Sequence, residues 1–303
     1  MRKLMDFQQK IADLLPGTEL RFDESLAKHT TFRIGGPAEV MAFPKTAAEL
    51  AEILNVSALL DQKPAILGAG TNVLAPDAGI RGLVICLKDC LGGMERIDDT
   101  HIRVAAGVTM TRAAIFACRA RLSGLEFAHG IPGTVGGGVY MNAGAYGGEI
   151  CQVCDQVEVM DMAGNLRTYA GSEMDFSYRH SRLEDEGGIV VSATFALTPK
   201  PGDQIAATMQ DLMARRSTSQ PLDMPSAGSA FKRPVGGYAA ALIDGAGLKG
   251  YRIGGAAVSQ KHAGFVVNLG GATAQNVKDL LASVSDKVYE NSGIRLEPEV
   301  RIW

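Results

Sequence analysis

The part of the sequence best suited to chemistry is a glycine-rich segment at residues 130–148, GIPGTVGGGVYMNAGAYGG, in which eight of the 19 residues are glycine. Val135, Val139 and Met141 within it are typical of a packed core, whereas flexible linkers are rich in serine and glutamine. Glycines among core residues let a ligand approach the backbone closely, and the N–H groups exposed there need an acceptor such as phosphate. The segment therefore predicts a site for a flat, phosphorylated cofactor. The alternative is a run of tight turns between strands.

A second glycine-rich turn supports the cofactor hypothesis. It reads LGAGTNVL at residues 67–74 and follows a short apolar run that is typical of a strand. It begins like a dinucleotide-binding fingerprint, but the third glycine is absent and no helix pattern follows, which argues against a Rossmann site. What remains is a turn whose backbone N–H groups, with the side chains of Thr71 and Asn72, can bind a pyrophosphate. The two turns together predict one long cofactor held at two places.

Composition limits the classes of function. The chain has 303 residues, enough for two or three domains, and 46% of them are hydrophobic, enough for sizeable cores. The net charge of -3 gives no electrostatic reason to expect nucleic acid or membrane partners, and no apolar run approaches the length of a membrane span. The N-terminal residues lack the pattern of a signal peptide, and an odd number of cysteines, five, indicates reduced thiols. We therefore expect a cytoplasmic protein.

One cysteine pair has the spacing of a redox or zinc motif. Cys151 and Cys154 form a single CxxC, which lies in a predicted strand rather than at the start of a helix. We interpret both as core thiols and expect no metal, and a redox or zinc site is the minor alternative.

The elements that position these segments are strands and helices in an irregular order. Apolar, β-branched runs predict strands at residues 38–43, 65–67, 83–87, 102–105, 157–162 and 189–197. Apolar spacings of three and four predict helices at residues 47–54, 111–122, 205–213 and 277–288, the last ended by Gly293. Thr46 and Glu49 form a capping box before the first helix. Because strands and helices do not alternate regularly, the pattern predicts an α+β fold rather than a doubly wound sheet.

Seven motifs in a fixed order carry a family resemblance. They are LGAGTNVL (67–74), IPGTVGGGVYMNAGAYGGE (131–149), FSYRHS (176–181), PSAGSAFKRP (225–234), GLKG (247–250), IGGAAVSQKHAGFVVN (253–268) and LEPEV (296–300). With these motifs the chain closely resembles the UDP-N-acetylenolpyruvoylglucosamine reductases, from His29 to Arg301. Its compact length resembles the shorter, type II branch of that family.

The resemblance implies an α+β fold in which two subdomains form an FAD-binding module of the vanillyl-alcohol-oxidase (PCMH) type. A third, C-terminal α+β domain binds the substrate. We expect the two FAD-binding subdomains at residues 1–50 and 51–200, and the substrate-binding domain at residues 201–303. The implied cofactor is non-covalent FAD, the implied co-substrate is NADPH, and no obligate protein partner is implied.

The implied reaction makes UDP-N-acetylmuramate, a peptidoglycan precursor, from UDP-N-acetylglucosamine enolpyruvate. NADPH first reduces FAD and leaves; the enolpyruvyl group then takes a hydride at its terminal carbon and a proton at the adjacent carbon. Negative charge builds up on the carboxylate between these two events. Such chemistry needs a fixed cation, a proton donor near the enol carbon, and exclusion of water.

The resemblance assigns three catalytic residues. Arg179 in FSYRHS holds the carboxylate, Ser229 in PSAGS donates the proton, and Glu299 in LEPEV stabilises the enol together with Arg179. By residue type alone, these would be a surface arginine, a turn serine and a solvated charge. Glu297 and Ser226 are close neighbours of the same types, and only the motif alignment separates them from the catalytic residues.

The resemblance also assigns binding residues. FAD is expected on both glycine-rich segments and on two arginines near its phosphates: Gly68, Ala69, Gly70, Thr71, Asn72, Val73, Leu74, Pro132, Gly133, Thr134, Gly136, Gly137, Asn142, Ala143, Gly144, Ala145, Arg216 and Arg301. A diphosphate and a uracil need charge and directional hydrogen bonds, which are expected from Tyr178, Lys232, Arg233, Lys249, His262 and Asn268.

Two other functions stay open at this point. A flavin oxidase of the same cofactor fold can hold its flavin covalently, and His129, beside the glycine-rich segment, is the residue that such a bond would use. Acid precipitation would then not release the flavin. A nucleotide-sugar-binding protein without catalysis would be colourless when purified.

Overall fold

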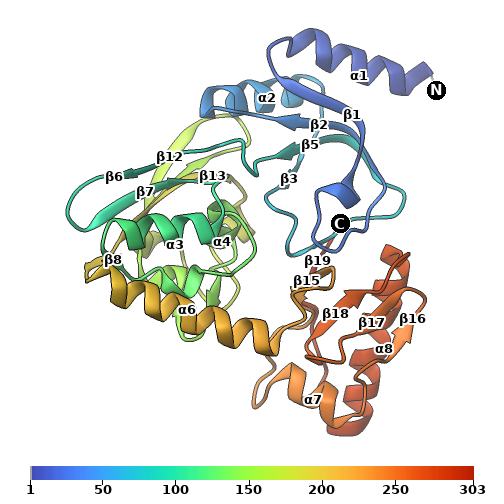
Figure 1. Cartoon of the computed structure of the whole chain (residues 1–303). Helices are drawn as coiled ribbons and strands as arrows, with labels where there is room; N and C mark the ends of the chain where they lie inside the picture. The colour runs from blue at the N-terminus through green and yellow to red at the C-terminus, as the bar shows by residue number, and fades with distance from the viewer. Residues whose placement is uncertain (1) are drawn as a thin grey trace. The chain divides into compact units, whose positions relative to one another are not determined.

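The computed structural model of the chain describes residues 2–303, with side chains described from Phe7 onwards. Its contacts divide the chain into two compact units, each of which is described by itself (Figure 1). Unit 1 comprises residues 2–22, 39–69 and 82–215, and unit 2 comprises residues 23–38, 70–81 and 216–303. The division into three domains at residues 50 and 200 stays a prediction.

One layer of unit 1 is a four-stranded sheet covered by two helices. Its strand order is β1 (Glu19–Ser25), β2 (Pro37–Phe43), β5 (Ile80–Cys86) and β3 (Ala65–Leu67), and the helices are α1 (Arg2–Leu14) and α2 (Ala47–Leu59). Leu50, Ile53 and Leu54 of α2 are buried against the sheet, as the predicted apolar stripe requires. Thr46 caps α2 by accepting the Glu49 N–H at 3.1 Å, which confirms the predicted helix start.

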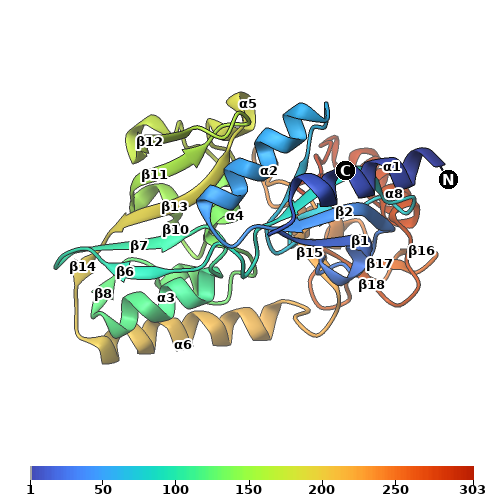
Figure 2. The same cartoon turned by 90° about the horizontal axis from the view of Figure 1, so that it is seen from above.

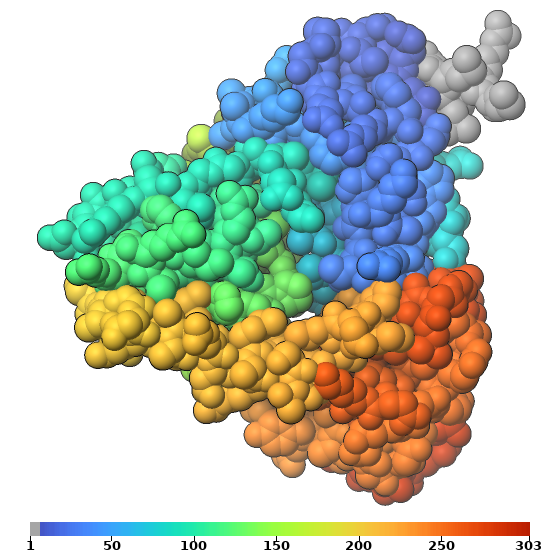
Figure 3. Space-filling model, in the orientation of Figure 1, coloured from blue at the N-terminus to red at the C-terminus, as the bar shows by residue number. Residues whose placement is uncertain are grey.

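The other layer of unit 1 is a five-stranded antiparallel sheet. Its order is β12 (Leu166–Ala170), β11 (Cys154–Met160), β13 (Ile189–Ala196), β7 (His101–Ala105) and β6 (Met94–Arg96). Helices α3 (Met110–Arg119), α4 (Val135–Tyr140) and α6 (Gly202–Ser219) contribute to the same core as this sheet. Figures 1 and 2 show α3 and α6 side by side, and their surfaces adjoin in green and yellow in Figure 3.

Unit 2 is a second α+β core. Its antiparallel sheet has the order β15 (Ser226–Ser229), β18 (Phe265–Asn268), β17 (Ala256–Val258) and β16 (Arg252–Ile253), with helices α7 (Ala239–Gly245) and α8 (Ala274–Ser292). The predicted stripe on α8 is buried, and Gly293 caps the helix with φ +72°. A short parallel pair joins β4 (Val73–Leu74) to β19 (Arg301–Ile302). The mixed architecture confirms the α+β prediction, and none of the described helices is long and apolar enough to cross a membrane.

Smaller elements complete the two units. They are the strands β8 (Leu122–Ser123), β9 (Gly144–Ala145), β10 (Gly148–Glu149) and β14 (Thr198–Pro199), the helix α5 (Leu183–Glu186), and the 3₁₀ turns η1 (Leu26–Lys28), η2 (Glu126–Ala128), η3 (Ile150–Gln152) and η4 (Gly171–Glu173).

The structure differs from two predictions, one within the glycine-rich segment and one directly after it. Helix α4 lies where the sequence predicts only a loop or turns, because tertiary packing outweighs the poor helix propensity of glycine: a Cβ on Gly136 would lie 2.9 Å from the Ala106 Cβ. The interpretation of the CxxC as a pair of core thiols in a strand is wrong for Cys151, which is exposed in η3. It is correct for Cys154, whose burial raises the pKa of the thiol to about 12.

The first turn of α8 receives a cap from a distant part of unit 2. The Asp77 carboxylate accepts the N–H of Ala274 at 2.7 Å and of Gln275 at 3.2 Å. A carboxylate at this place satisfies two N–H groups that have no partner within the helix and also interacts favourably with the helix dipole. Asp77 therefore fastens residues 70–81 to the C-terminal helix of the same unit.

We expect Asp77→Asn to lower the free energy of unfolding by about 1 kcal/mol. The amide oxygen can still accept one N–H group, but the negative charge is lost, and the amide NH₂ would point at the other N–H group, which needs an acceptor. Urea denaturation followed by circular dichroism measures the loss. Asp279→Asn is the matched control, because Asp279 is exposed on α8 and, within the described part of the chain, its carboxylate accepts from the Gln275 side chain alone. Equal losses in the two variants would contradict the capping role.

Candidate active site

Within unit 1 the two glycine-rich segments lie against each other. A Cβ built on Gly68 would lie only 2.7 Å from the Thr134 Oγ1, so Gly68 must lack a side chain for the segments to approach this closely. Thr134 is buried and caps α4 by accepting the Gly137 N–H at 3.3 Å. The turn after β3 and the segment at 130–148 therefore meet at the start of α4, as one cofactor held at two places requires.

Several backbone N–H groups at this meeting point have no acceptor in the protein. Among the described residues, the N–H groups of Gly68, Ala69, Gly133 and Thr134 donate to no protein atom. Successive unpaired N–H groups form a concave, positively polarised surface that binds anions. These four groups lie in unit 1 and are candidates for binding a diphosphate.

Other residues of the same two segments stabilise the fold and do not offer N–H groups or space to a ligand. The N–H groups of Val135 and Gly136 donate to the carbonyls of Val108 and Ala106 at 2.8 and 2.9 Å, and so are not available to a ligand. In unit 2, a Cβ on Gly70 would lie 2.1 Å from the His29 carbonyl oxygen. Substitution of Gly70 would therefore distort its own chain, and is no specific probe of phosphate binding.

The side chain and backbone of Asn72 connect the turn to the C-terminal segment of unit 2. Its carboxamide donates to the Glu299 carbonyl at 3.1 Å, and its own carbonyl accepts the Arg301 N–H at 2.9 Å. Val73 and Leu74 follow as strand β4, which pairs with β19. These contacts fix the backbone at the predicted catalytic glutamate and directly after it.

Ser229 and Glu299 are brought together within unit 2. Strand β15 contains an irregularity at which Ser226 pairs with Val267 and Ser229 with Phe265, and Gly228 adopts φ +76°. The pairing resumes after the bulge at Ser229, the last residue of the strand, which is exposed. The next residue, Ala230, accepts the Glu299 N–H at 2.9 Å, so the glutamate lies beside the end of β15.

Glu297 and Glu299 differ in their surroundings. The Glu297 carboxylate is 3.6 Å from the Lys232 ammonium, and both side chains are largely exposed. Such surface pairs contribute less than about 1 kcal/mol. Glu299 is half-buried in the segment that pairs with Ala230 and Asn72. Lys232, expected to bind the substrate, thus has a competing partner in Glu297.

Arg179 occupies a strained turn beside the glycine-rich segment of unit 1. Ser177 and His180 exchange two backbone hydrogen bonds of 3.2 Å, which makes Tyr178 and Arg179 the two central residues of a tight turn. Arg179 has φ +57°, a conformation that costs a bulky L-residue free energy. Its guanidinium donates to the Gly144 carbonyl at 3.4 Å and lies 5.1 Å from the centre of the Tyr178 ring.

Because Arg179 belongs to unit 1, whereas Ser229 and Glu299 belong to unit 2, the meeting of all three residues stays a prediction.

Some predicted binding residues have side chains that the protein itself engages. The Asn268 carboxamide is buried; it donates to the Phe32 carbonyl at 3.0 Å and accepts the N–H groups of Gly270 and Ala272. The Lys249 ammonium is 2.7 Å from an Asp244 carboxylate oxygen. Two of the other predicted cations are also engaged: Arg233 stacks 4.1 Å above the Tyr238 ring, and buried Arg216 donates to the Gln220 side chain at 3.3 Å. Their contacts with ligands stay predictions.

His262 has a defined protonation state. Burial lowers the pKa of His262 below its usual range, and the Nδ1 accepts the Gly264 N–H at 3.1 Å. The ring is therefore neutral at neutral pH with its proton on Nε2. His262 can donate one directional hydrogen bond without carrying charge, which suits a uracil carbonyl.

Two residues that hold this region together were not predicted from the sequence. Ser181, fully buried, donates its hydroxyl to the Tyr140 carbonyl at 2.8 Å. The Glu149 carboxylate accepts from the Asn142 carboxamide at 2.9 Å. Both residues belong to the quoted motifs, so the signal was present, but their partners are not adjacent in sequence.

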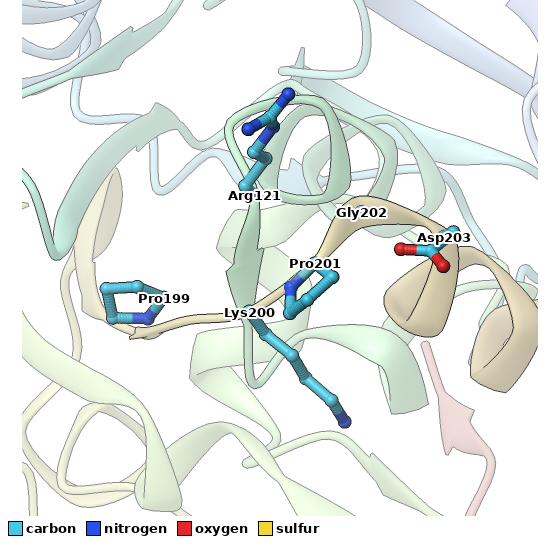
Figure 4. A pocket seen from close by; sticks show the side chains of 6 residues that line it. All are labelled: Arg121, Pro199, Lys200, Pro201, Gly202 and Asp203. Atoms are coloured by element: carbon cyan, nitrogen blue, oxygen red, sulfur yellow. The ribbon is translucent and has the colours of Figure 1, made fainter.

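A shallow pocket in unit 1 contains none of the predicted site residues. It has a volume of about 690 Å³ and is lined by Arg121, Pro199, Lys200, Pro201, Gly202 and Asp203. Figure 4 shows the side chains of Arg121 and Lys200 pointing in different directions, so no cluster of like charge forms there. The glycine-rich meeting point is therefore the better candidate.

Two family models match the chain, and one of the matches includes both glycine-rich segments. Residues 38–170 match a family model described as "FAD binding domain", and residues 220–303 match "UDP-N-acetylenolpyruvoylglucosamine reductase, C-terminal domain". The chain is 46% identical over 307 residues to the UDP-N-acetylenolpyruvoylglucosamine reductase of Agathobacter rectalis, and 43% identical over 298 residues to that of Streptococcus pneumoniae. Each alignment covers 98% of both chains. The crystal structure of the Thermus caldophilus reductase matches with a TM-score of 0.78 at 36% identity, covering 94% of this chain and 98% of that one.

Proposed function

Because the chain belongs to the family of UDP-N-acetylenolpyruvoylglucosamine reductases, we propose that it reduces UDP-N-acetylenolpyruvoylglucosamine to UDP-N-acetylmuramate with electrons from NADPH. The chain is an oxidoreductase with an FAD-binding domain. The product is a precursor of peptidoglycan, and a cytoplasmic location follows from the proposed substrates, since nucleotide sugars and NADPH are made there. We expect no obligate protein partner for this reaction.

The residues of the site fit FAD. The unpaired N–H groups of Gly68, Ala69, Gly133 and Thr134 would hold the diphosphate by backbone dipoles alone. Gly68 lacks the side chain that would fill the space beside Thr134. We propose that FAD is bound without a covalent link; His129, whose Nδ1 is buried without a hydrogen-bond partner in the described structure, is the residue to check for such a link.

The three catalytic residues have distinct tasks in the proposed reaction. The bound cofactor, once reduced, supplies the hydride for the terminal carbon of the enolpyruvyl group. Arg179 presents a planar guanidinium to the substrate carboxylate, where charge develops, and can bind both oxygens. Glu299 is proposed to stabilise the enol together with Arg179.

Ser229 is the proposed proton donor to the carbon next to the carboxylate. A serine hydroxyl is a weak acid, so this role requires a strongly basic carbon held within contact distance. The position of Ser229 after the β15 bulge, exposed and next to the segment that carries Glu299, supports the assignment.

The observation that carries the proposal is the meeting of two glycine-rich segments with unpaired N–H groups in a chain of this family. The test is the visible spectrum of the purified protein, followed by anaerobic NADPH and then the enolpyruvyl substrate. We expect a yellow protein. Acid should release its flavin, NADPH should bleach the flavin colour, and the enolpyruvyl substrate should reoxidise the reduced flavin. A colourless protein would instead favour a nucleotide-sugar-binding protein without catalysis. A flavin that acid does not release, and that oxygen but not the substrate reoxidises, would favour a flavin oxidase.

A further inference from the structure

The turn that carries Arg179 is fastened to the glycine-rich segment by a buried amide, Asn142. This side chain is 1% exposed. Its Nδ2 donates to the Ser177 carbonyl at 3.0 Å and to a Glu149 carboxylate oxygen at 2.9 Å. Its Oδ1 accepts the Cys151 N–H at 3.0 Å. Because one end must donate to a carbonyl and the other must accept from an N–H, the orientation of the amide is fixed.

A second buried side chain fastens the other end of the same turn. Ser181 is 0% exposed, and its hydroxyl donates to the Tyr140 carbonyl at the end of α4 at 2.8 Å. The two anchors therefore lie on either side of the turn, at Ser177 and at Ser181, and both connect it to residues 140–142. Arg179 lies between them, and its guanidinium reaches Gly144 of the same segment.

The backbone in this region is under unusual strain. Nine non-glycine residues of the described chain have positive φ, and three of them, Asn142, Tyr146 and Arg179, belong to the glycine-rich segment and the turn beside it. Left-handed conformations of non-glycine residues persist only where the surroundings over-determine them, and they concentrate at functional sites. The hydrogen bonds of Asn142 and Ser181 supply such surroundings for the strained turn of Arg179.

We propose that Asn142 and Ser181 are positioning residues, which hold Arg179 in the strained conformation that presents its guanidinium to the substrate carboxylate. Asn142 was expected to bind FAD directly, but its amide already makes three hydrogen bonds within the protein. The proposal rests on the proposed function, because it acts through Arg179. It predicts that either residue affects the substrate half-reaction only as long as Arg179 is present.

The test is stopped-flow reoxidation of NADPH-reduced enzyme by the enolpyruvyl substrate, in a double-mutant cycle with Arg179→Ala. Asn142→Asp keeps the size of the side chain but replaces two donors by an acceptor that faces the Ser177 carbonyl and the Glu149 carboxylate. We expect reoxidation to slow about 100-fold in this variant, the scale expected when a catalytic group is misplaced by about 1 Å. Ser181→Ala, which removes one hydroxyl, should slow the same step in the same direction.

The cycle distinguishes positioning from other roles. In the Arg179→Ala background, Asn142→Asp and Ser181→Ala should cause no further loss, and reduction by NADPH should stay at its rate in the parent enzyme. Asn165→Asp and Ser177→Ala are the matched controls. Asn165 is in an exposed turn, and the hydrogen bond between Asn142 and Ser177 uses the backbone carbonyl of Ser177 rather than its side chain. Flavin absorbance and thermal unfolding check that each variant is folded and loaded.

Each outcome has one reading. Wild-type reoxidation in Asn142→Asp and Ser181→Ala, with a slow Arg179→Ala, would overturn the positioning proposal alone. Additive losses in the double variants would also overturn it, because the two residues would then act on the cofactor or on the fold. Wild-type reoxidation in Arg179→Ala itself would instead overturn the role of Arg179 in the proposed function.

Discussion

Ser229→Ala is expected to slow reoxidation of the reduced flavin by the enolpyruvyl substrate by about 10²- to 10⁴-fold, the contribution typical of a positioned general acid. Reduction of the flavin by NADPH should proceed as in the wild type, because Ser229 acts only after NADPH has left. Anaerobic stopped-flow absorbance measures the two half-reactions separately in one preparation. A loss confined to the second half-reaction identifies a group that acts on the substrate rather than on the cofactor.

Ser226→Ala is the internal control for this prediction. Ser226 lies on the same strand, and the contact that ties it to Thr31 uses its backbone carbonyl, which accepts the Thr31 hydroxyl at 2.7 Å. Its substitution should therefore leave both half-reactions unchanged. Equal behaviour of the two serine variants would show that the motif is aligned in the wrong register.

Glu299→Gln is expected to lower kcat by about 10²- to 10³-fold with a much smaller change in KM, because the carboxylate acts on an enol that exists only near the transition state. Arg179→Lys keeps the positive charge but loses the planar fork, and should impair both kcat and KM since the substrate carboxylate is present in the ground state as well. Steady-state kinetics together with stopped-flow reoxidation of the reduced flavin separate the two effects.

Glu297→Gln provides the comparison for Glu299. Its carboxylate makes a surface ion pair with Lys232, so we expect a change in kcat of less than about two-fold. A wild-type rate in Glu299→Gln, combined with a slow Glu297→Gln, would transfer the catalytic role to Glu297.

Much of the fold could be predicted because its signals are local. The stripe of Val277, Leu280 and Val284 and the glycine after it define α8 without any knowledge of its partners. Thr46 and Glu49 do the same for the start of α2. Helix α4 could not be predicted, because it depends on contact with Ala106, which is distant in sequence.

The candidate site divides in the same way. Motifs placed Arg179, Ser229 and Glu299 in the chain, and the glycine pattern indicated phosphate binding. Neither the motifs nor the glycine pattern could reveal that the Asn268 amide forms hydrogen bonds with Phe32 and with its own loop. Nor could they reveal that the Asn142 amide, expected to bind FAD, donates to the turn that carries Arg179. Such partners are set by the tertiary fold, and residue types alone do not encode them.

The hydrogen bond between Asn72 and Glu299, which spans 227 positions, also constrains how the chain can fold as it is made. At about 5–20 residues per second, a ribosome needs about 10 to 45 s to travel between these two residues. During that time β4 has no β19 to pair with, and Asp77 faces no helix end. The glycine-rich turn and its strand then have exposed edges of the kind that chaperones bind, and unit 2 assembles only after its final segment has been synthesised.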